Sequence, residues 1–161
     1  MVLQGAGTPT PVTIVVMATI PAGAREFLKQ GALAHIVTLE PDGSPHVSLA
    51  WAGADGDGVV WSTFSDQHKL DNLRRDPRIA LSFEAHEPGD EPLHPYLVID
   101  GRARIEEGGA LDVMDTLSEF YLGPGREYPW RDAPPGFTIR VDVDKVYGQG
   151  SWRSEDDASG A

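Results

Sequence analysis

The sequence has no cysteine, few basic residues and no long apolar run, and each absence excludes a class of protein. Without cysteine in 161 residues, disulfides, thiolate metal sites and thiol nucleophiles are excluded, and a reducing cytoplasmic location is expected. No stretch approaches the ~20 apolar residues of a membrane-spanning helix, so no membrane partner is expected. The net charge of −12, from 25 acidic and 13 basic residues, disfavours nucleic acid as a partner.

The common signatures of catalysis and nucleotide binding are also missing. The chain has no GxGxxG dinucleotide fingerprint and no GxSxG nucleophile elbow. Its histidines show no metal-ligand spacing; they are His35, His46, His68, His86 and His94. The sequence therefore predicts no metal site, and it assigns no side chain a catalytic role.

Turn signals and hydrophobic periodicity divide the chain into short elements. Period-two alternation predicts six strands, at 32–40, 45–53, 59–64, 78–84, 96–105 and 137–143. Helical spacing predicts three helices, at 21–30, 66–76 and 111–121. Because most connections read as hairpins, we expect a mainly β (α+β) domain built as an antiparallel barrel with flanking helices. A glycine inside the fifth strand, Gly101, predicts a bulge or a bend.

The two ends are poor in structure-forming signals. We expect residues 1–16 to be a disordered leader, residues 17–153 to form one folded domain, and residues 154–161 to be a disordered tail. Met17 opens a normal domain start, MATIPAGAREFL, and is an alternative to Met1 as the first residue.

The segment 61–78, WSTFSDQHKLDNLRRDPR, has the most chemical content. It reads as strand, turn and helix N-terminus, with Ser65 as the expected N-cap. A helix N-terminus offers unpaired N–H groups and suits phosphate. Lys69 lies in the first helical turn, where a cation is unfavourable unless an anion binds. Ser62 and Thr63 end the preceding strand and can reach the same anion.

Two interpretations of the basic residues remain open at this point. Arg74, Arg75 and Arg78 gather positive charge near Lys69, which favours an anion site. Alternatively, Lys69 is a solvated surface residue and the arginines pair with the abundant carboxylates. The long loop 123–136 leaves a similar choice, because Tyr128 and Trp130 are placed there either to meet a ligand or partner or only to pack.

The ordered motifs resemble a known family. The series ALAHIVTLEPDGSPHVSLAW, VVWSTFSDQHKLDNLRRDPRIALSFE and YLVIDGRARI resembles the pyridoxamine 5'-phosphate oxidase-like superfamily of FMN-binding split barrels. HKLDNLRRDPRIAL looks most like the actinobacterial branch that uses the deazaflavin coenzyme F420. The resemblance covers residues 24–148 and implies a six-stranded antiparallel split β-barrel.

The resemblance also implies cofactor-binding residues. Val47, Ser48 and Leu49 match the strand whose backbone lies against the flavin ring. Ser62 and Thr63 match the hydroxyl pair that reaches the phosphate or the ribityl chain.

Lys69 matches the phosphate lysine of the family. His68, just before it, stands where FMN-binding members often have arginine, and His46 occupies a strand position that is often basic. These two departures favour F420 over FMN. Asn72 completes the set of cofactor-binding residues that the resemblance implies.

The implied function is an F420-dependent oxidoreductase, a reductase that moves a hydride between the deazaflavin and a small conjugated organic molecule. The alternatives are an FMN-dependent oxidoreductase of the same fold, and a non-catalytic protein that binds F420, FMN or haem. The resemblance further implies a homodimer with the cofactor at the subunit interface. An apolar face containing Val47, Leu49 and Trp51 would be buried there.

Overall fold

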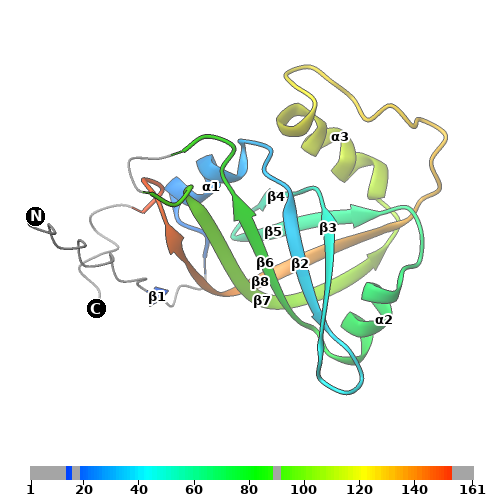
Figure 1. Cartoon of the computed structure of the whole chain (residues 1–161). Coiled ribbons are helices and arrows are strands. Elements are labelled where there is room, and N and C mark those ends of the chain that lie inside the picture. The colour runs from blue at the N-terminus through cyan, green and yellow to red at the C-terminus, as the bar shows by residue number, and fades with distance from the viewer. Residues whose placement is uncertain (1–13, 16–18, 89–91, 154–161) are drawn as a thin grey trace, which may run out of the picture.

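The computed structural model of the chain describes residues 14–15, 19–88 and 92–153. This part of the chain forms eight strands and three helices (Figure 1). The strands are β1 (Ile14–Val15), β2 (Ala34–Leu39), β3 (Pro45–Ala50), β4 (Ala52–Asp55), β5 (Gly58–Thr63), β6 (Arg78–Glu84), β7 (Tyr96–Glu107) and β8 (Phe137–Gln149). The helices are α1 (Ala22–Leu28), α2 (His68–Arg75) and α3 (Ala110–Tyr121).

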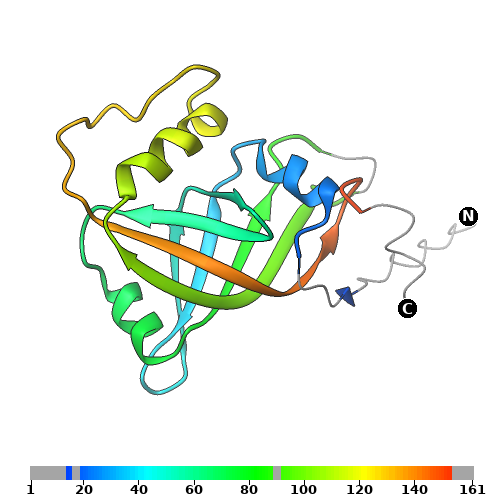
Figure 2. The same ribbon diagram turned by 180° about the vertical axis from the view of Figure 1, so that it is seen from behind.

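The strands form one antiparallel sheet that curls into an open barrel (Figure 1 and Figure 2). Its order is β3-β2-β6-β7-β8-β5-β4, and β1 pairs with β8 beside this path. The two ends of the order, β3 and β4, are neighbours in sequence. The expected class, mainly β and split-barrel, is therefore confirmed.

The structure has eight described strands rather than the expected six, because the short β1 was not expected and because one expected strand, 45–53, is two. The apolar alternation runs without interruption through residues 45–53, yet the chain changes partner at Trp51. Before that residue β3 pairs with β2, and after it β4 pairs with β5. Alternation records which face a side chain takes, but it does not record which strand lies alongside, so the sequence did not show the switch.

The core lies inside the curl and is filled mainly from β2, β5, β6, β7 and β8, with one large side chain each from α2 and α3. Its largest fully buried side chains are Trp61, Phe83, Ile36, Leu70, Leu81, Leu97, Ile99, Leu117 and Ile139. Burial of each such side chain contributes about 1.5–3 kcal/mol. The long strands β7 and β8, which are joined through α3, pair with a register shift between Asp100 and Gly101, in agreement with the bulge or bend expected at this glycine. A Cβ at Gly101 would lie 2.3 Å from the carbonyl oxygen of Asp142, so a side chain does not fit there.

Helix α2 begins two residues later than the sequence indicated. Its N-cap is Gln67 rather than Ser65. The reason is local: the Thr63 hydroxyl donates to the Ser65 carbonyl at 3.2 Å, and this turn delays the helix. Leu70 and Leu73, which lie one helical turn apart, are buried against the barrel. The helix ends at Arg75, before the extended residue that precedes Pro77.

Helix α3 fixes the point where the chain changes strand partner. The Tyr121 hydroxyl accepts the Ala52 N–H at 3.0 Å and lies within donating distance of the Ala32 and Ala52 carbonyls, at 2.6 and 2.9 Å. Burial raises the pKa of this phenol to about 12, so it stays protonated. The Trp51 ring stacks on Tyr121, with centroids 4.8 Å apart and 9° between the planes.

The chain ends fall mostly outside the described residues. Ile14 and Val15 pair with Tyr147 and Val146 of β8. The expectations for the rest of residues 1–16, for Met17 and for residues 154–161 concern residues that the structure does not describe. Among the described helices, none is long and apolar enough to cross a membrane.

We expect Tyr121→Phe to lower the free energy of unfolding by about 1–3 kcal/mol, because it leaves buried backbone groups unpaired. Tyr147→Phe is the control, since that hydroxyl makes one 3.3 Å bond to Asp100. Urea unfolding with an unchanged slope measures both changes. Equal losses in the two variants would contradict the role given to Tyr121.

Candidate functional site

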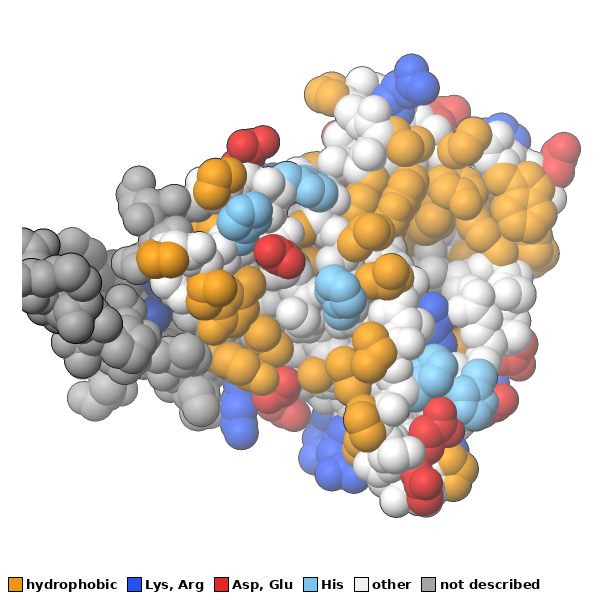
Figure 3. Space-filling model, in the orientation of Figure 1, with side chains coloured by type: hydrophobic (Ala, Val, Ile, Leu, Met, Phe, Trp, Pro, Cys, Tyr) orange, Lys and Arg blue, Asp and Glu red, His pale blue; other side chains and the backbone are white. Residues whose placement is uncertain are grey.

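A hollow of about 400 Å³ opens where five segments meet. These are the end of β3, the end of β5, the start of α2, the middle of α3 and the loop after α3. Figure 3 shows hydrophobic side chains gathered over α3 and the loop that follows it. The hollow is lined by Leu49, Ala50, Trp51, Ser62, Thr63, Phe64, Ser65, Gln67, Lys69, Met114 and Tyr128.

Lys69 is the only charged residue among those that line the hollow. Its side chain is buried, with 6 % of the residue exposed, and its Nζ lies 5.0 Å from the centre of the Trp61 ring. Among the described residues it has no hydrogen bond and no carboxylate partner. Burial lowers the pKa of this ammonium. A buried cation without a counter-charge is costly, and a bound anion would remove that cost.

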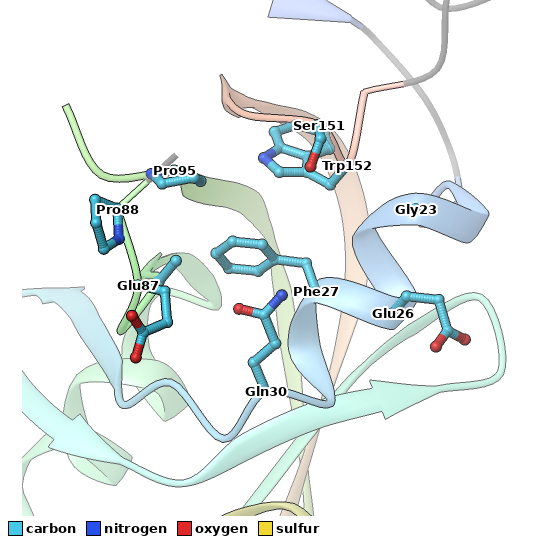
Figure 4. Close-up of a pocket in the computed structure, with 10 residues that line it drawn as sticks. Gly23, Glu26, Phe27, Gln30, Glu87, Pro88, Pro95, Ser151 and Trp152 are labelled. Atoms are coloured by element: carbon cyan, nitrogen blue, oxygen red, sulfur yellow. The ribbon is translucent and has the colours of Figure 1, made fainter. Parts of the chain in front are cut away.

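Two other hollows differ in charge. One, near α1, has no basic residue in its lining; Figure 4 shows the rings of Phe27 and Trp152 near Pro95, with Glu87 at the edge. The other, on the outside of the sheet, mixes three basic residues with Asp100 and Asp144. Within the described chain, the hollow at Lys69 therefore suits an anion best.

The arginines near Lys69 do not add to this site. Arg74 binds Asp66 and Asp71, each at 2.9 Å, and Arg78 binds Asp76 at 2.6 Å. For these two arginines the pairing interpretation is correct. Lys69 is the opposite case, because it is buried rather than solvated.

The start of α2 supplies further donors. Gln67 makes no side-chain hydrogen bond to the first turn, so N–H donors of that turn are not capped by a side chain. Such amides and the positive end of the helix dipole both favour an anion beside Lys69.

The two strand-end hydroxyls line the hollow, but their protons are used within the protein. Ser62 donates to the Ala110 carbonyl at 3.1 Å, and Thr63 donates to the Ser65 carbonyl. Each oxygen can still accept a hydrogen bond. The pair therefore suits ligand hydroxyls, such as those of a ribityl chain, better than a phosphate.

Strand β3 has a free edge toward the hollow. The Glu40 N–H donates to the Ser44 carbonyl at 2.8 Å and closes the β2–β3 hairpin. Because paired residues alternate along an antiparallel ladder, Val47 and Leu49 direct their N–H and C=O groups away from β2. Their side chains are 59 % and 54 % exposed. The hydroxyl of Ser48 is buried and has no partner among the described residues.

Four of the eight expected cofactor-binding residues lie outside the lining: Val47, Ser48, His68 and Asn72. His68 Nε2 lies 2.8 Å from a Glu40 carboxylate oxygen, and this hydrogen bond lowers the Glu40 pKa. The His46 ring packs edge-on against His68, with centroids 5.2 Å apart. Asn72 is fully buried and donates to the Thr38 hydroxyl at 3.1 Å. His68 and Asn72 thus contact the β2–β3 hairpin.

The structure brings Leu49, Ser62, Thr63 and Lys69, four of the eight expected residues, together in one lining. The sequence did not single out Phe64, Gln67 and Met114, which also line the hollow. Phe64 and Gln67 could have been expected there, because they lie between Thr63 and Lys69 in the sequence. Met114 gave no signal, because a methionine at helical spacing indicates packing.

A comparison with protein families matches residues 20–150 of this chain to pyridoxamine 5'-phosphate oxidase. The chain belongs to the pyridoxamine 5'-phosphate oxidase family. This is a flavin-binding split-barrel family made up mostly of flavin-dependent oxidoreductases. No curated protein matches the sequence.

Solved structures agree with the family. An F420 reductase is 24 % identical, with a TM-score of 0.62, over 79 % of this chain and 98 % of the other. A conserved hypothetical protein from Mycobacterium tuberculosis is 25 % identical, with a TM-score of 0.66, over 86 % and 88 %. A candidate pyridoxamine 5'-phosphate oxidase from Listeria innocua is 19 % identical, with a TM-score of 0.55, over 78 % and 94 %. At these identities the likeness supports the fold.

We expect Lys69→Met to stabilise the ligand-free protein at neutral pH, because it removes a buried, unpaired charge. A gain of about 1 kcal/mol raises the Tm of a domain this size by about 2–4 °C. The Lys69 pKa is lowered on folding, so the unfolded chain binds the proton more tightly. The stability that the wild-type protein loses to the Lys69 charge is therefore lost in full below the pKa of Lys69 in the folded state. This loss disappears as the pH rises toward 10.5, the ordinary pKa of lysine.

Thermal unfolding from pH 7 to pH 10.5 tests this. Lys29→Met is the matched control, because Lys29 is exposed and pairs with Glu26 at 2.6 Å. A gain that appears in both variants, or that does not shrink at high pH, would contradict the burial argument.

Proposed function

We propose that this chain is an F420-dependent oxidoreductase that reduces a small conjugated organic molecule. The observation that carries the proposal is Lys69: a buried residue, without a partner among the described residues, that faces a hollow lined by no carboxylate in a chain of net charge −12. A ligand that brings a phosphate to this point would supply the missing counter-charge. Family membership supports a flavin-type cofactor as that ligand.

The residues present fit such a cofactor along its whole length. Lys69 and the first amides of α2 would hold the phosphate. Ser62 and Thr63 would accept hydrogen bonds from the hydroxylated chain. The free backbone groups of Val47 and Leu49 would bind the polar edge of the ring, and Ser48 lies between them.

Two observations support F420 over FMN. At neutral pH a terminal phosphomonoester carries nearly two negative charges, whereas the phosphodiester of F420 carries one. A single buried lysine matches one charge better than two. In addition, His68 is engaged with Glu40, so it does not act as a second cation for the phosphate.

The protein's own contribution would be positioning and exclusion of water. When bound, the deazaflavin supplies hydride transfer. Trp51, Phe64 and Tyr128 surround the hollow with apolar surface, which lowers the local dielectric. Tyr128 carries the one phenol hydroxyl of the lining, so a proton needed by the substrate would come from Tyr128 or from water.

Titration followed by turnover tests the proposal. The chain is titrated with F420 and with FMN, and the complex with reduced F420 is mixed with quinones, nitroaromatics, enones and tetrapyrroles. Tighter FMN binding would favour an FMN-dependent oxidoreductase instead. Tight binding of F420, FMN or haem without turnover of any acceptor would favour a carrier or sensor.

We expect Lys69→Ala to weaken F420 binding by roughly 10- to 150-fold, because a charge-assisted hydrogen bond contributes about 1.5–3 kcal/mol. Added salt should weaken wild-type binding more than variant binding. Fluorescence titration measures both effects, with Lys145→Ala as an exposed-lysine control. Unchanged affinity in Lys69→Ala would show that the phosphate site lies elsewhere.

We also propose a homodimer with the cofactor between the subunits. The support is the exposed apolar pair Val47 and Leu49 beside an unpaired strand edge, since such edges are normally covered. A second copy laid on this face would close the open side of the hollow.

Light scattering at micromolar concentration should therefore give the mass of two chains. Val47→Asp should shift the mass toward one chain, because it places a charge in the apolar contact. The exposed Leu93, which lies outside this face, gives the control Leu93→Asp. A wild-type monomer that binds cofactor with full affinity would overturn the shared site.

A further inference from the structure

A row of five aromatic rings forms one wall of the hollow and continues beyond it. Trp51 stacks on Tyr121 and meets Tyr128 edge-on, with centroids 5.8 Å apart and 87° between planes. Phe64 follows at 5.4 Å from Tyr128, and Trp130 at 5.2 Å from Phe64. The row leads from the strand switch at Trp51 out to solvent, where Trp130 is 49 % exposed. We call it the aromatic row.

The aromatic row is held in place by polar contacts behind it. Asp115 of α3 accepts the Tyr128 N–H at 2.8 Å and an Arg131 N–H at 2.6 Å. Arg131 in turn donates to the Tyr128 carbonyl at 3.2 Å. The Arg131 guanidinium lowers the Asp115 pKa, so the carboxylate stays ionised at neutral pH. The loop segment that carries Tyr128 and Trp130 is therefore tied to α3.

The row differs from a core cluster in its exposure. Phe64 and Tyr128 are only half-buried, and the Trp130 side chain is largely in water. Holding large rings rigidly beside a cavity has an energetic cost that a ligand can offset by covering them. Arg131 lies 2.6 Å from Asp115 and 3.9 Å from Glu127, so this arginine is paired and does not offer the row a free positive charge.

We propose that the aromatic row binds the planar ring of the substrate, and that this substrate is an uncharged, conjugated bicyclic or monocyclic molecule. The inference rests on the proposed function, because it places this ring next to the cofactor. The anionic contact at Lys69 belongs to the cofactor, and the row has no second cation for an acid. Electron-rich indole and phenol rings stack well on an electron-poor conjugated ring. A cavity of about 400 Å³ is suited to a small molecule.

The test uses menadione, an uncharged naphthoquinone, with Trp130→Leu and Tyr128→Leu. Calorimetry gives the Kd for menadione with and without F420, and fluorescence gives the Kd for F420. Stacking on one aromatic side chain contributes on the order of 1–3 kcal/mol, so each variant should bind menadione about 5- to 150-fold more weakly. F420 affinity should stay within about twofold of wild type in Trp130→Leu, because Trp130 is not among the residues that line the hollow. Leu93→Ala, an exposed apolar change outside the row, should alter neither Kd.

Each other outcome has a definite meaning. Unchanged menadione affinity in both variants would overturn the inference. An equal loss of F420 and menadione affinity would overturn it too, because the row would then hold the cofactor ring. Conversion of a wild-type dimer to monomers by either variant would make the row an interface and reject the substrate role. Row-dependent menadione binding without any F420 or FMN binding would support the row while the proposed function fails.

Trp130→Leu keeps the test conclusive if Tyr128→Leu does not fold. Because Trp130 is largely exposed, its variant should keep the wild-type Tm even if Tyr128→Leu does not. With reduced F420 present, the KM for menadione should rise in Trp130→Leu by the same factor as the Kd. A change in kcat at an unchanged KM would count against a binding role.

Discussion

The burial of one ammonium group, that of Lys69, is the constraint on which the candidate site depends. An unpaired charge in a protein interior is tolerated only where something offsets its desolvation. Here the described residues supply a Trp61 ring and no carboxylate, although the chain has 25 acidic residues. The nearby acids are instead used by Arg74 and Arg78. Because these acids pair with arginines, Lys69 keeps a positive charge at the hollow that no described carboxylate compensates. One such charge in a negative protein suits the binding of one anion.

The place of that point follows from the topology of the barrel. The chain leaves β3 and joins β5 through β4, so the sheet stays open where β3 ends. Tyr121 closes part of this opening by bonding backbone groups on both sides of it. What remains is a hollow with one free strand edge, one helix start and one aromatic wall. Each of these is a consequence of the open sheet, because a closed barrel would pair the edge and bury the wall.

Much of this could be predicted from the sequence, and the failures have physical causes. Alternation and turn residues located the strands, and the bulge at Gly101 followed from a glycine within a strand. The switch at Trp51 could not be predicted, because alternation is the same whichever strand lies alongside. Ser65 was wrong as N-cap since the hydroxyl of Thr63 engages its carbonyl first. The engagement of His68 with Glu40 depends on a hairpin 28 residues away, and local patterns do not contain such contacts.

The two ends of the hollow attract a ligand over different distances. Attraction of an anion to Lys69 acts over several ångströms in a cavity of low dielectric, whereas stacking on Trp51, Phe64 or Tyr128 requires contact. A ligand that carries both a charge and a ring would therefore be oriented by its charged end before its ring is seated. A ligand with only a ring gains nothing at Lys69 and competes for the aromatic wall alone. For the proposed cofactor and substrate, this geometry favours ordered occupation, with the phosphorylated cofactor first and the uncharged ring second.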